Sequence, residues 1–123
     1  MPVPHRNYAD VRVVTPAGRL DHANCDTFRA DIAEHVDACV VGGRLVLDLS
    51  GLEYVSSAGL RCLMLAAKEA DLRGIRMVVA AMQPVVAEIF QISRFHLVFD
   101  IFATLGEALA AISPDAARAY QHG

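Results

Sequence analysis

No apolar run in this 123-residue sequence reaches the roughly 18 residues that a membrane-spanning helix needs. The N-terminal residues 1–6 also lack the apolar segment that follows the charged start of a secretory signal. We therefore expect a cytoplasmic protein without a membrane partner.

Excess positive charge is missing as well. The formal net charge is −3, and the arginines are scattered and form no basic stripe. Nucleic-acid binding normally shows such a stripe as its electrostatic footprint. We expect no nucleic-acid partner.

Clusters with metal-ligand spacing and glycine-rich phosphate loops are also missing, so we expect no metal, no cofactor and no intrinsic NTPase activity. Of the three cysteines, Cys25 and Cys39 are expected at opposite ends of one helix, ~21 Å apart, which is too far for a disulfide. The expectation is three reduced thiols, including Cys62, that pack as small hydrophobic side chains.

Strand and helix patterns alternate along the chain. Helical spacing is present up to about Val40 and again after Ser57, and Pro84 and the T-x-x-E capping box at Thr104 begin two further helices. Apolar runs that indicate buried strands lie between them, at residues 8–20 (one or two strands), 45–49, 75–81 and 97–102. The order β(β)αβαβαβα predicts an α/β fold with a mixed, mainly parallel sheet of four to five strands and four helices.

A chain of this length forms a single core. We place the domain at residues 8–113, with an N-terminal extension at 1–7 and a C-terminal tail at 114–123 that frays or packs loosely. Ligands and partners of such folds usually bind at the carboxyl ends of the strands. The turn that follows the strand at 45–49 belongs to that edge.

This turn leads into two adjacent serines, Ser56 and Ser57, where a helix is expected to begin. A serine at that place lies beside free backbone N–H groups and the positive end of the helix dipole, so it suits a phosphate. A plain N-cap hydroxyl, worth about 1 kcal/mol, is the simpler interpretation, and the two are compatible. Ser56 is expected to cap or support the turn.

Two motifs resemble the STAS domain family, and specifically its free-standing anti-sigma factor antagonists. The first is V-L-D-L-S-G-L-E-Y-V-S-S-A-G-L at residues 46–60, and the second is G-R-L-D at residues 18–21. The resemblance covers roughly residues 11–112. It implies the fold derived above and a non-enzymatic regulator.

The resemblance also implies a partner-switching cycle. The unphosphorylated protein binds an anti-sigma factor that is also a GHKL-type serine kinase, phosphorylation releases it, and a PP2C-type phosphatase resets it. The serine two residues before the motif glycine is the acceptor, here Ser57, with Ser56 as second choice. Many members carry aspartate at the position of Ser56. The expected partner-binding residues are Asp21, His22, Ser56, Ser57, Ala58, Gly59 and Arg61.

Some alternatives stay open. Asp21 is either an N-cap of the first helix or a contact to the kinase. Gly59 is expected to let a partner backbone or a neighbouring turn approach closely. The same module could instead serve as a docking subunit of a stressosome or of a lipid-transport complex. A small hydrolase with Ser57 as nucleophile, Asp100 and His122 is disfavoured because the sequence lacks G-x-S-x-G.

Overall fold

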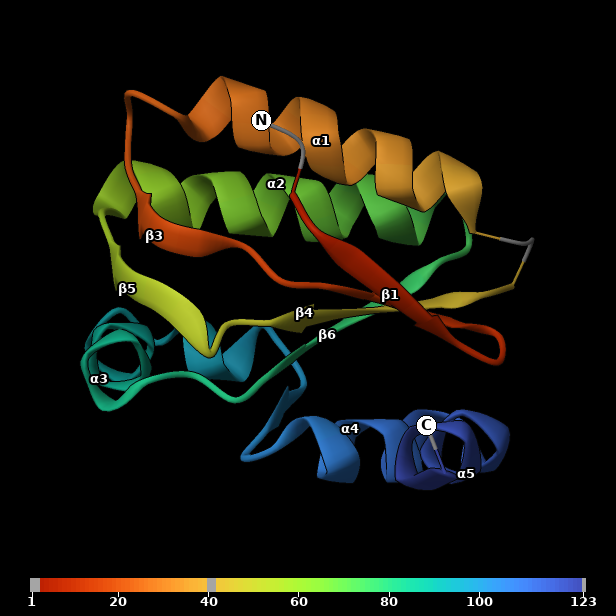
Figure 1. Cartoon of the computed structure of the whole chain (residues 1–123). Helices are drawn as coiled ribbons and strands as arrows, with labels where there is room; N and C mark the ends of the chain where they lie inside the picture. Colours follow the sequence, from red (N-terminus) through yellow and green to blue (C-terminus); the bar gives the residue numbers. More distant parts are fainter. Residues whose placement is uncertain (1–2, 40–41, 123) are drawn as a thin grey trace.

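Two layers of helices enclose a central sheet in the computed structural model, which describes residues 3–39 and 42–122 (Figure 1). Helices α1 and α2 cover one face and α4 and α5 the other, whereas α3 lies at one end of the molecule and its buried Val86 and Phe90 join the core on the α1–α2 side. The helices are α1 (Cys25–Ala38), α2 (Ser57–Leu72), α3 (Pro84–Ile92), α4 (Leu105–Ile112) and α5 (Pro114–His122), with a short 3₁₀ helix η1 (Phe95–Leu97). This is the expected α/β fold, with one helix more than predicted.

The main sheet has the strand order β1-β2-β4-β6-β7. Only β1 is antiparallel to its neighbour; the other three pairs are parallel, as helix crossovers require. The strands are β1 (His5–Tyr8), β2 (Val11–Val14), β4 (Arg44–Asp48), β6 (Arg76–Ala80) and β7 (Ile101–Phe102). The mainly parallel sheet predicted from the sequence is confirmed.

A second, two-stranded parallel sheet pairs β3 (Ala17–Leu20) with β5 (Gly51–Val55). The sequence predicted a polar turn where β5 lies, and that prediction is wrong. Leu52 and Val55 face inward while Gly51 and Glu53 are exposed, so the strand is short and partly polar. It forms because β3 offers a parallel partner, a contact between segments far apart in the sequence.

The core is divided by the main sheet. Leu45 and Leu47 of β4 pack toward α1 and α2, whereas Val46 packs toward α4 and α5, and all three are fully buried. This confirms a strand buried on both faces, as a parallel strand between helices should be. The carboxylate of Asp48 accepts a hydrogen bond from the Ser50 amide (3.0 Å) and so shapes the turn after β4.

The C-terminal part differs most from the prediction. Only residues 101–102 of the expected strand 97–102 are extended, and η1 occupies its start. The expected loose tail is the helix α5, anchored by the fully buried Ala116. Its Tyr120 ring packs edge-on against the Tyr8 ring, with the two ring centroids 5.4 Å apart. A short amphipathic segment gave no clear signal for this packing.

The N-terminal strand β1 starts at His5, so part of the segment expected to be an extension, 1–7, belongs to the sheet. At the first helix, the expected end near Val40 lies outside the described residues. Asn24, not Asp21, occupies the N-cap position of α1.

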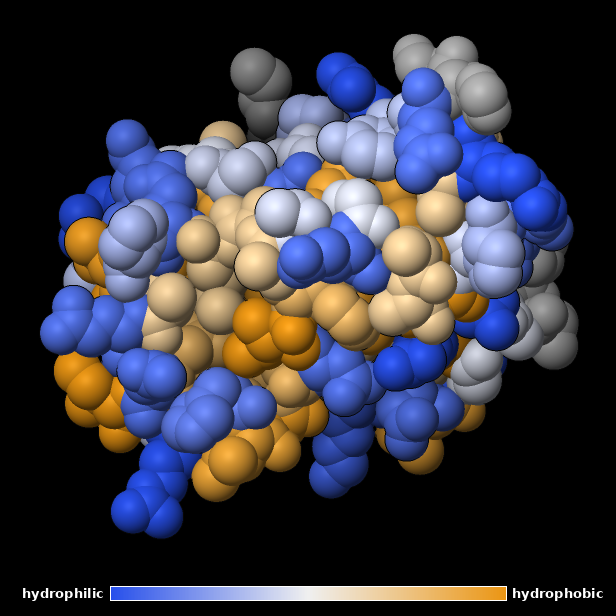
Figure 2. All heavy atoms as spheres, turned by 90° about the horizontal axis from the view of Figure 1, so that it is seen from below, coloured by the Kyte–Doolittle hydropathy of each residue, from blue (hydrophilic) through white to orange (hydrophobic). Residues whose placement is uncertain are grey.

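Several apolar side chains remain on the surface. Figure 2 shows apolar atoms gathered in the middle of the face seen from below, with polar side chains around them. Val85 and Met64 were expected to face the core, but their exposed fractions are 54% and 37%. Ile92 and Leu97 are also exposed.

Candidate functional site

The two serines have different roles at the start of α2. Ser56 is the N-cap, and its hydroxyl accepts a hydrogen bond from the Gly59 amide (3.1 Å), which confirms its predicted role as the cap. Ser57 is the first helical residue and is exposed. Among the described residues, no hydrogen bond involves the Ser57 hydroxyl. The cap therefore leaves Ser57 open to solvent.

Gly59 lies directly beneath the end of β3. A Cβ atom at this position would lie 2.4 Å from the Leu20 carbonyl oxygen and 2.8 Å from Cγ2 of Val55. The same carbonyl accepts a hydrogen bond from the Ser56 amide (2.9 Å). The expectation of a close approach by a neighbouring turn is confirmed, and Gly59 itself is buried.

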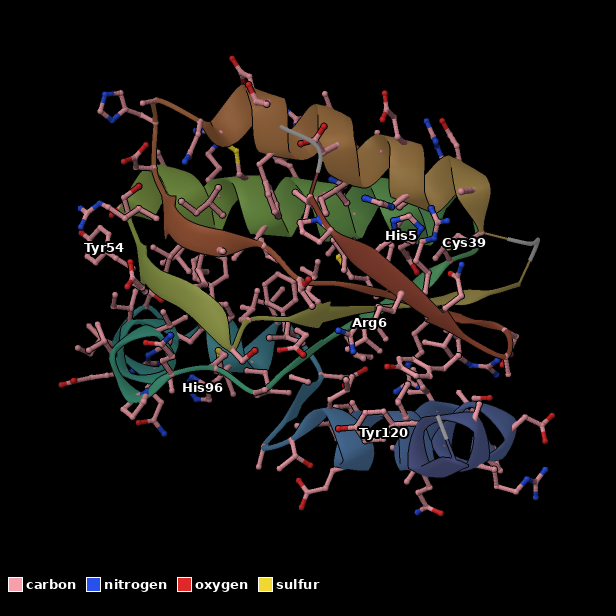
Figure 3. The ribbon with its side chains drawn as sticks, in the orientation of Figure 1. His5, Arg6, Cys39, Tyr54, His96 and Tyr120 are labelled. Atoms are coloured by element: carbon pink, nitrogen blue, oxygen red, sulfur yellow. A yellow bond between two sulfur atoms is a disulfide. The ribbon has the colours of Figure 1, made fainter. Side chains whose placement is uncertain are left out.

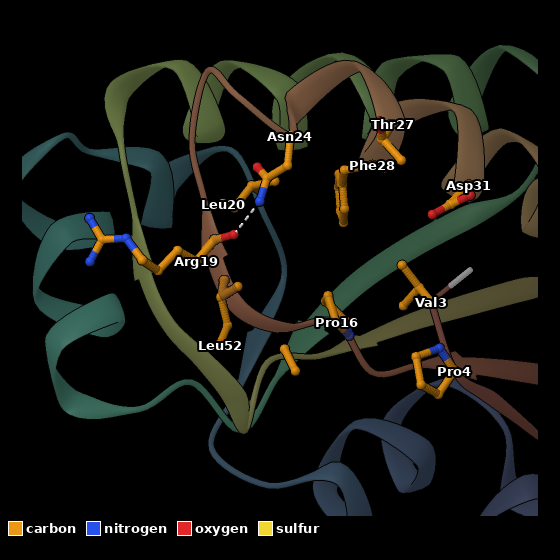
Figure 4. A pocket seen from close by; sticks show the side chains of 11 residues that line it. Val3, Pro4, Pro16, Arg19, Leu20, Asn24, Thr27, Phe28, Asp31 and Leu52 are labelled. Atoms are coloured by element: carbon orange, nitrogen blue, oxygen red, sulfur yellow. Dashed lines mark hydrogen bonds between the residues drawn. The ribbon is translucent and has the colours of Figure 1, made fainter. Parts of the chain in front are cut away.

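This contact brings the two sequence motifs together. The turn at residues 21–24 follows Leu20 and leads into α1. Its amides bond within the turn: the Asp21 carboxylate accepts from the Ala23 amide and the Asn24 side chain accepts from the Asp21 amide, both at 2.9 Å. The Asn24 amide group also donates to the Arg19 carbonyl at 2.6 Å (Figure 4). Asp21 thus stabilises its own turn, and His22 is exposed beside it.

Positive and aromatic groups flank the serine turn. Arg61 is exposed one turn into α2. The Arg19 guanidinium lies 4.5 Å above the centre of the Tyr54 ring, which points outward from β5 (Figure 3). Sequence reasoning missed Arg19 and Tyr54 because β5 was not recognised; their alternation with buried Leu20 and Val55 is the signal that could have found them. The first turn of α2 carries no acidic side chain that would compete with a phosphate.

A disulfide joins α1 to α2 behind this turn. Cys25, the first residue of α1, is bonded to Cys62, and their Cα atoms are 6.0 Å apart, within the usual range. The Cys25 sulfur also lies 3.6 Å from the carbonyl oxygen of half-buried Ala58. The expectation of three reduced thiols is wrong, because two helices that pack side by side bring together cysteines far apart in the sequence.

A cavity of about 270 Å³ lies on the other side of β3, against α1 (Figure 4). Pro16, Leu20, Phe28 and Leu52 give it a mainly apolar lining, and Asp31 is its acidic side chain. It lies next to the turn at 21–24 but the two serines do not line it.

Ser57 and Asp100, two of the residues that a hydrolase would need, lie apart. Asp100 is paired with Arg76 (3.1 Å) at the amino end of β6, so it lies at the edge of the sheet opposite to the serine turn. The His122 side chain lies outside the described part of the structure. Within the described ranges there is no group of three potential metal-binding side chains. No helix among the residues described is both long and apolar enough to span a bilayer.

Fold and site together define a small α/β domain that presents an exposed serine at the start of its second helix. The chain belongs to the STAS domain family, whose model matches residues 3–108. A putative anti-sigma factor antagonist of Bordetella bronchiseptica, BtrV, is 39% identical over 94 residues, which cover 76% of this chain and 78% of the relative. This level of identity over most of both chains supports the same family.

Solved structures share the fold. A putative anti-sigma factor antagonist from Thermotoga maritima superposes with a TM-score of 0.79 at 18% identity, covering 89% of this chain and 93% of the other. The anti-sigma factor antagonist SpoIIAA in its unphosphorylated form gives 0.71 at 21% identity, with 89% and 95% covered. The phosphorylated form of SpoIIAA, from Bacillus, gives 0.64 at 20% identity, with 89% and 98% covered.

Proposed function

We propose that this chain is an anti-sigma factor antagonist of the partner-switching type, whose switch is phosphorylation of Ser57. The observation that carries the proposal is the division of roles at the start of α2. Ser56 caps the helix, and Ser57 is exposed with its hydroxyl free of hydrogen bonds to the described residues. The names of its relatives, and the two forms in which SpoIIAA was solved, support the proposal.

The physical effect of the phosphate differs between fold and interface. A phosphate on Ser57 adds about −1.5 to −2 charge beside the N–H groups that open α2. The helix dipole favours this charge by roughly 1 kcal/mol, so the fold survives. A partner that docks over the serine meets a new dianion, whose desolvation and repulsion cost several kcal/mol. Phosphorylation therefore releases the partner.

The surface that a partner covers consists of the serine turn and the turn beside it. Exposed His22, half-buried Asp21 and exposed Arg61 surround Ser57 in our proposal. Arg19 and Tyr54 extend this surface along the second sheet. The proposed partners are a GHKL-type anti-sigma factor/serine kinase and a PP2C-type phosphatase. No cofactor and no catalytic residue of the chain's own are needed.

Intact-mass analysis after incubation with ATP and the cognate kinase tests the acceptor. We expect one added phosphate on the wild type and on Ser56→Ala, and none on Ser57→Ala. Ser56→Ala is the matched control, because it removes a neighbouring hydroxyl and only about 1 kcal/mol of capping energy. Phosphate on Ser57→Ala, or its loss only in Ser56→Ala, contradicts the proposal.

A further inference from the structure

We propose that Cys25 and Cys62 form a reversible thiol–disulfide pair, and that its oxidation locks the turn at residues 21–24 against α2 and slows phosphorylation of Ser57. This redox control rests on the proposed function for its effect on the switch. The disulfide itself stands on geometry alone. The bond joins the first residue of α1 to the second turn of α2, across a sequence separation of 37.

Hydrogen bonds tie the turn at residues 21–24 together just before Cys25. Three hydrogen bonds hold the turn internally, from the amides of Ala23, Asp21 and Asn24. A fourth, from the Asn24 side chain to the Arg19 carbonyl, fixes it to β3. A tether at Cys25, which follows Asn24 directly, therefore restrains the whole turn.

The disulfide lies close to the start of α2, next to Ser57. The Cys25 sulfur is 3.6 Å from the carbonyl oxygen of Ala58, the residue after Ser57. The Leu20 carbonyl, at the other end of the turn, accepts from the Ser56 amide. When the disulfide is present, covalent and hydrogen bonds fix the turn from both sides. A kinase that encloses Ser57 must fit around this turn or displace it, and a locked turn does not move aside.

The two sulfurs differ in access. Cys25 is half-buried, whereas Cys62 is 1% exposed. An external reagent therefore reaches Cys25 first. The third cysteine, Cys39, is half-buried and free, so it has no second cysteine beside it with which to close a disulfide in the described structure. Of the described cysteines, Cys25 and Cys62 are therefore the two that can form an intramolecular disulfide.

Exchange with a low-molecular-weight disulfide such as oxidised glutathione balances the step. The Cys25 thiol loses its proton and attacks one glutathione sulfur, which forms a mixed disulfide and releases one glutathione thiol. The Cys62 thiolate then attacks the Cys25 sulfur and displaces the second glutathione. The protein gives up two protons and two electrons, and glutathione disulfide becomes two thiols. Disulfides are rare where glutathione keeps thiols reduced, and those that do form there are usually transient and either catalytic or redox-sensing.

The experiment equilibrates the full chain in reduced and in oxidised glutathione and reads three quantities. Intact mass and thiol titration report the disulfide. Hydrogen exchange reports the amides at 21–24 and 57–60, and incubation with ATP and the cognate GHKL-type kinase reports the rate of Ser57 phosphorylation. We expect a disulfide in the wild type and in Cys39→Ser but not in Cys25→Ser or Cys62→Ala. In the oxidised wild type, hydrogen exchange and phosphorylation should both slow about tenfold. In Cys25→Ser, both rates should be the same in reduced and in oxidised glutathione.

Absence of the disulfide in oxidised glutathione overturns the inference, and so does equal exchange in the two states. Equal phosphorylation rates despite a formed disulfide overturn the redox control of the switch. If Ser57 accepts no phosphate even in the reduced protein, the proposed function fails. Intact mass and hydrogen exchange still show whether the disulfide forms and whether it restrains the turn at residues 21–24.

Discussion

Gly59 connects the serine turn to the fold. Its missing side chain leaves room for the Leu20 carbonyl oxygen, which would lie 2.4 Å from a Cβ atom. That oxygen belongs to backbone and cannot swing away as a flexible side chain would. The motif glycine is therefore a packing requirement at the junction of β3 and α2.

Gly59→Ala should lower the free energy of unfolding by about 2–3 kcal/mol, because the added methyl group overpacks this junction. Urea unfolding followed by circular dichroism measures the change. Gly106→Ala is the matched control, since the nearest atom to its Cβ is Cε2 of Tyr120 at an ordinary 3.6 Å and the position is helical. We expect that variant to be neutral or up to about 1 kcal/mol more stable. Equal losses in both variants contradict the packing role.

We expect His35 to make the stability of the protein depend on pH, independently of the proposed switch. The Arg12 guanidinium donates to His35 Nδ1 (3.0 Å), and Nε2–H donates to the Val3 carbonyl (3.2 Å), which defines a neutral ring. Burial lowers the pKa of His35, and the positive charge of Arg12 acts in the same direction. The His5 ring, 5.0 Å away, adds to this lowering, and Asp31 opposes it.

The direction of the pH dependence follows from this lowered pKa. The unfolded chain takes up a proton at His35 near pH 6.5 while the folded chain does not, so His35 favours the folded state fully above that pH. Unfolding free energy should fall as the pH drops from 7.5 to 5.5, by at most about 1.4 kcal/mol per pH unit from this residue. His35→Gln should remove that part of the slope in urea titrations at several pH values. Exposed His22→Gln is the control, and a slope unchanged in His35→Gln refutes the assignment.

The helix α5 depends on a polar contact that links distant ends of the chain. The Ser113 hydroxyl donates to Asp10 Oδ1 (2.7 Å) and accepts from the Ala116 amide (3.2 Å). Ser113 is buried, and Asp10 also pairs with Arg44 at 2.9 Å. These bonds fix the start of α5 to the turn between β1 and β2.

Ser113→Ala should cost about 1–2 kcal/mol, because it removes a helix cap and one hydrogen bond to a carboxylate. Thermal or urea unfolding measures the loss, and limited proteolysis should cut the chain near α5 first. Ser50→Ala, at an exposed turn, is expected to change stability by less than about 0.5 kcal/mol. Stability equal to that of the wild type in Ser113→Ala means that α5 does not depend on this contact.

Long elements with a regular pattern could be predicted from the sequence, whereas short ones that depend on distant partners could not. The start of α2 at Ser57, Pro84 at the start of α3 and the Thr104 cap of α4, whose hydroxyl accepts from the Glu107 amide, all agree with local signals. The strand β5 exists because β3 lies beside it, and α5 because it packs on β1. Neither partner can be read from the segment itself.

The same distinction holds for the site. Ser56 as cap followed from local chemistry, because a helix start leaves N–H groups that a hydroxyl can accept from. Gly59 indicated a close approach, but not that the neighbour would be the Leu20 carbonyl. Arg19, Tyr54 and the Cys25–Cys62 bond required knowledge of which strands and helices are neighbours. Periodicity along one segment carries no information about such pairs.

In the whole domain, the residues that stabilise the fold are separate from the exposed serine at the start of α2. The core lies on both faces of the sheet, while Ser57 is exposed at the edge where β5 leads into α2. We expect a charge placed there to weaken the binding of a docking partner far more than it destabilises the fold.

The affinity of the cognate anti-sigma factor/kinase for wild type and for Ser57→Asp, measured by calorimetry in parallel with urea unfolding, tests this separation most directly. A loss of ~3–4 kcal/mol in binding is more than a hundredfold in affinity. We predict that loss with a free energy of unfolding within about 0.5 kcal/mol of wild type, and Ser57→Ala should bind as wild type does. Equal affinity of wild type and Ser57→Asp, or a loss of binding explained by unfolding, contradicts the account.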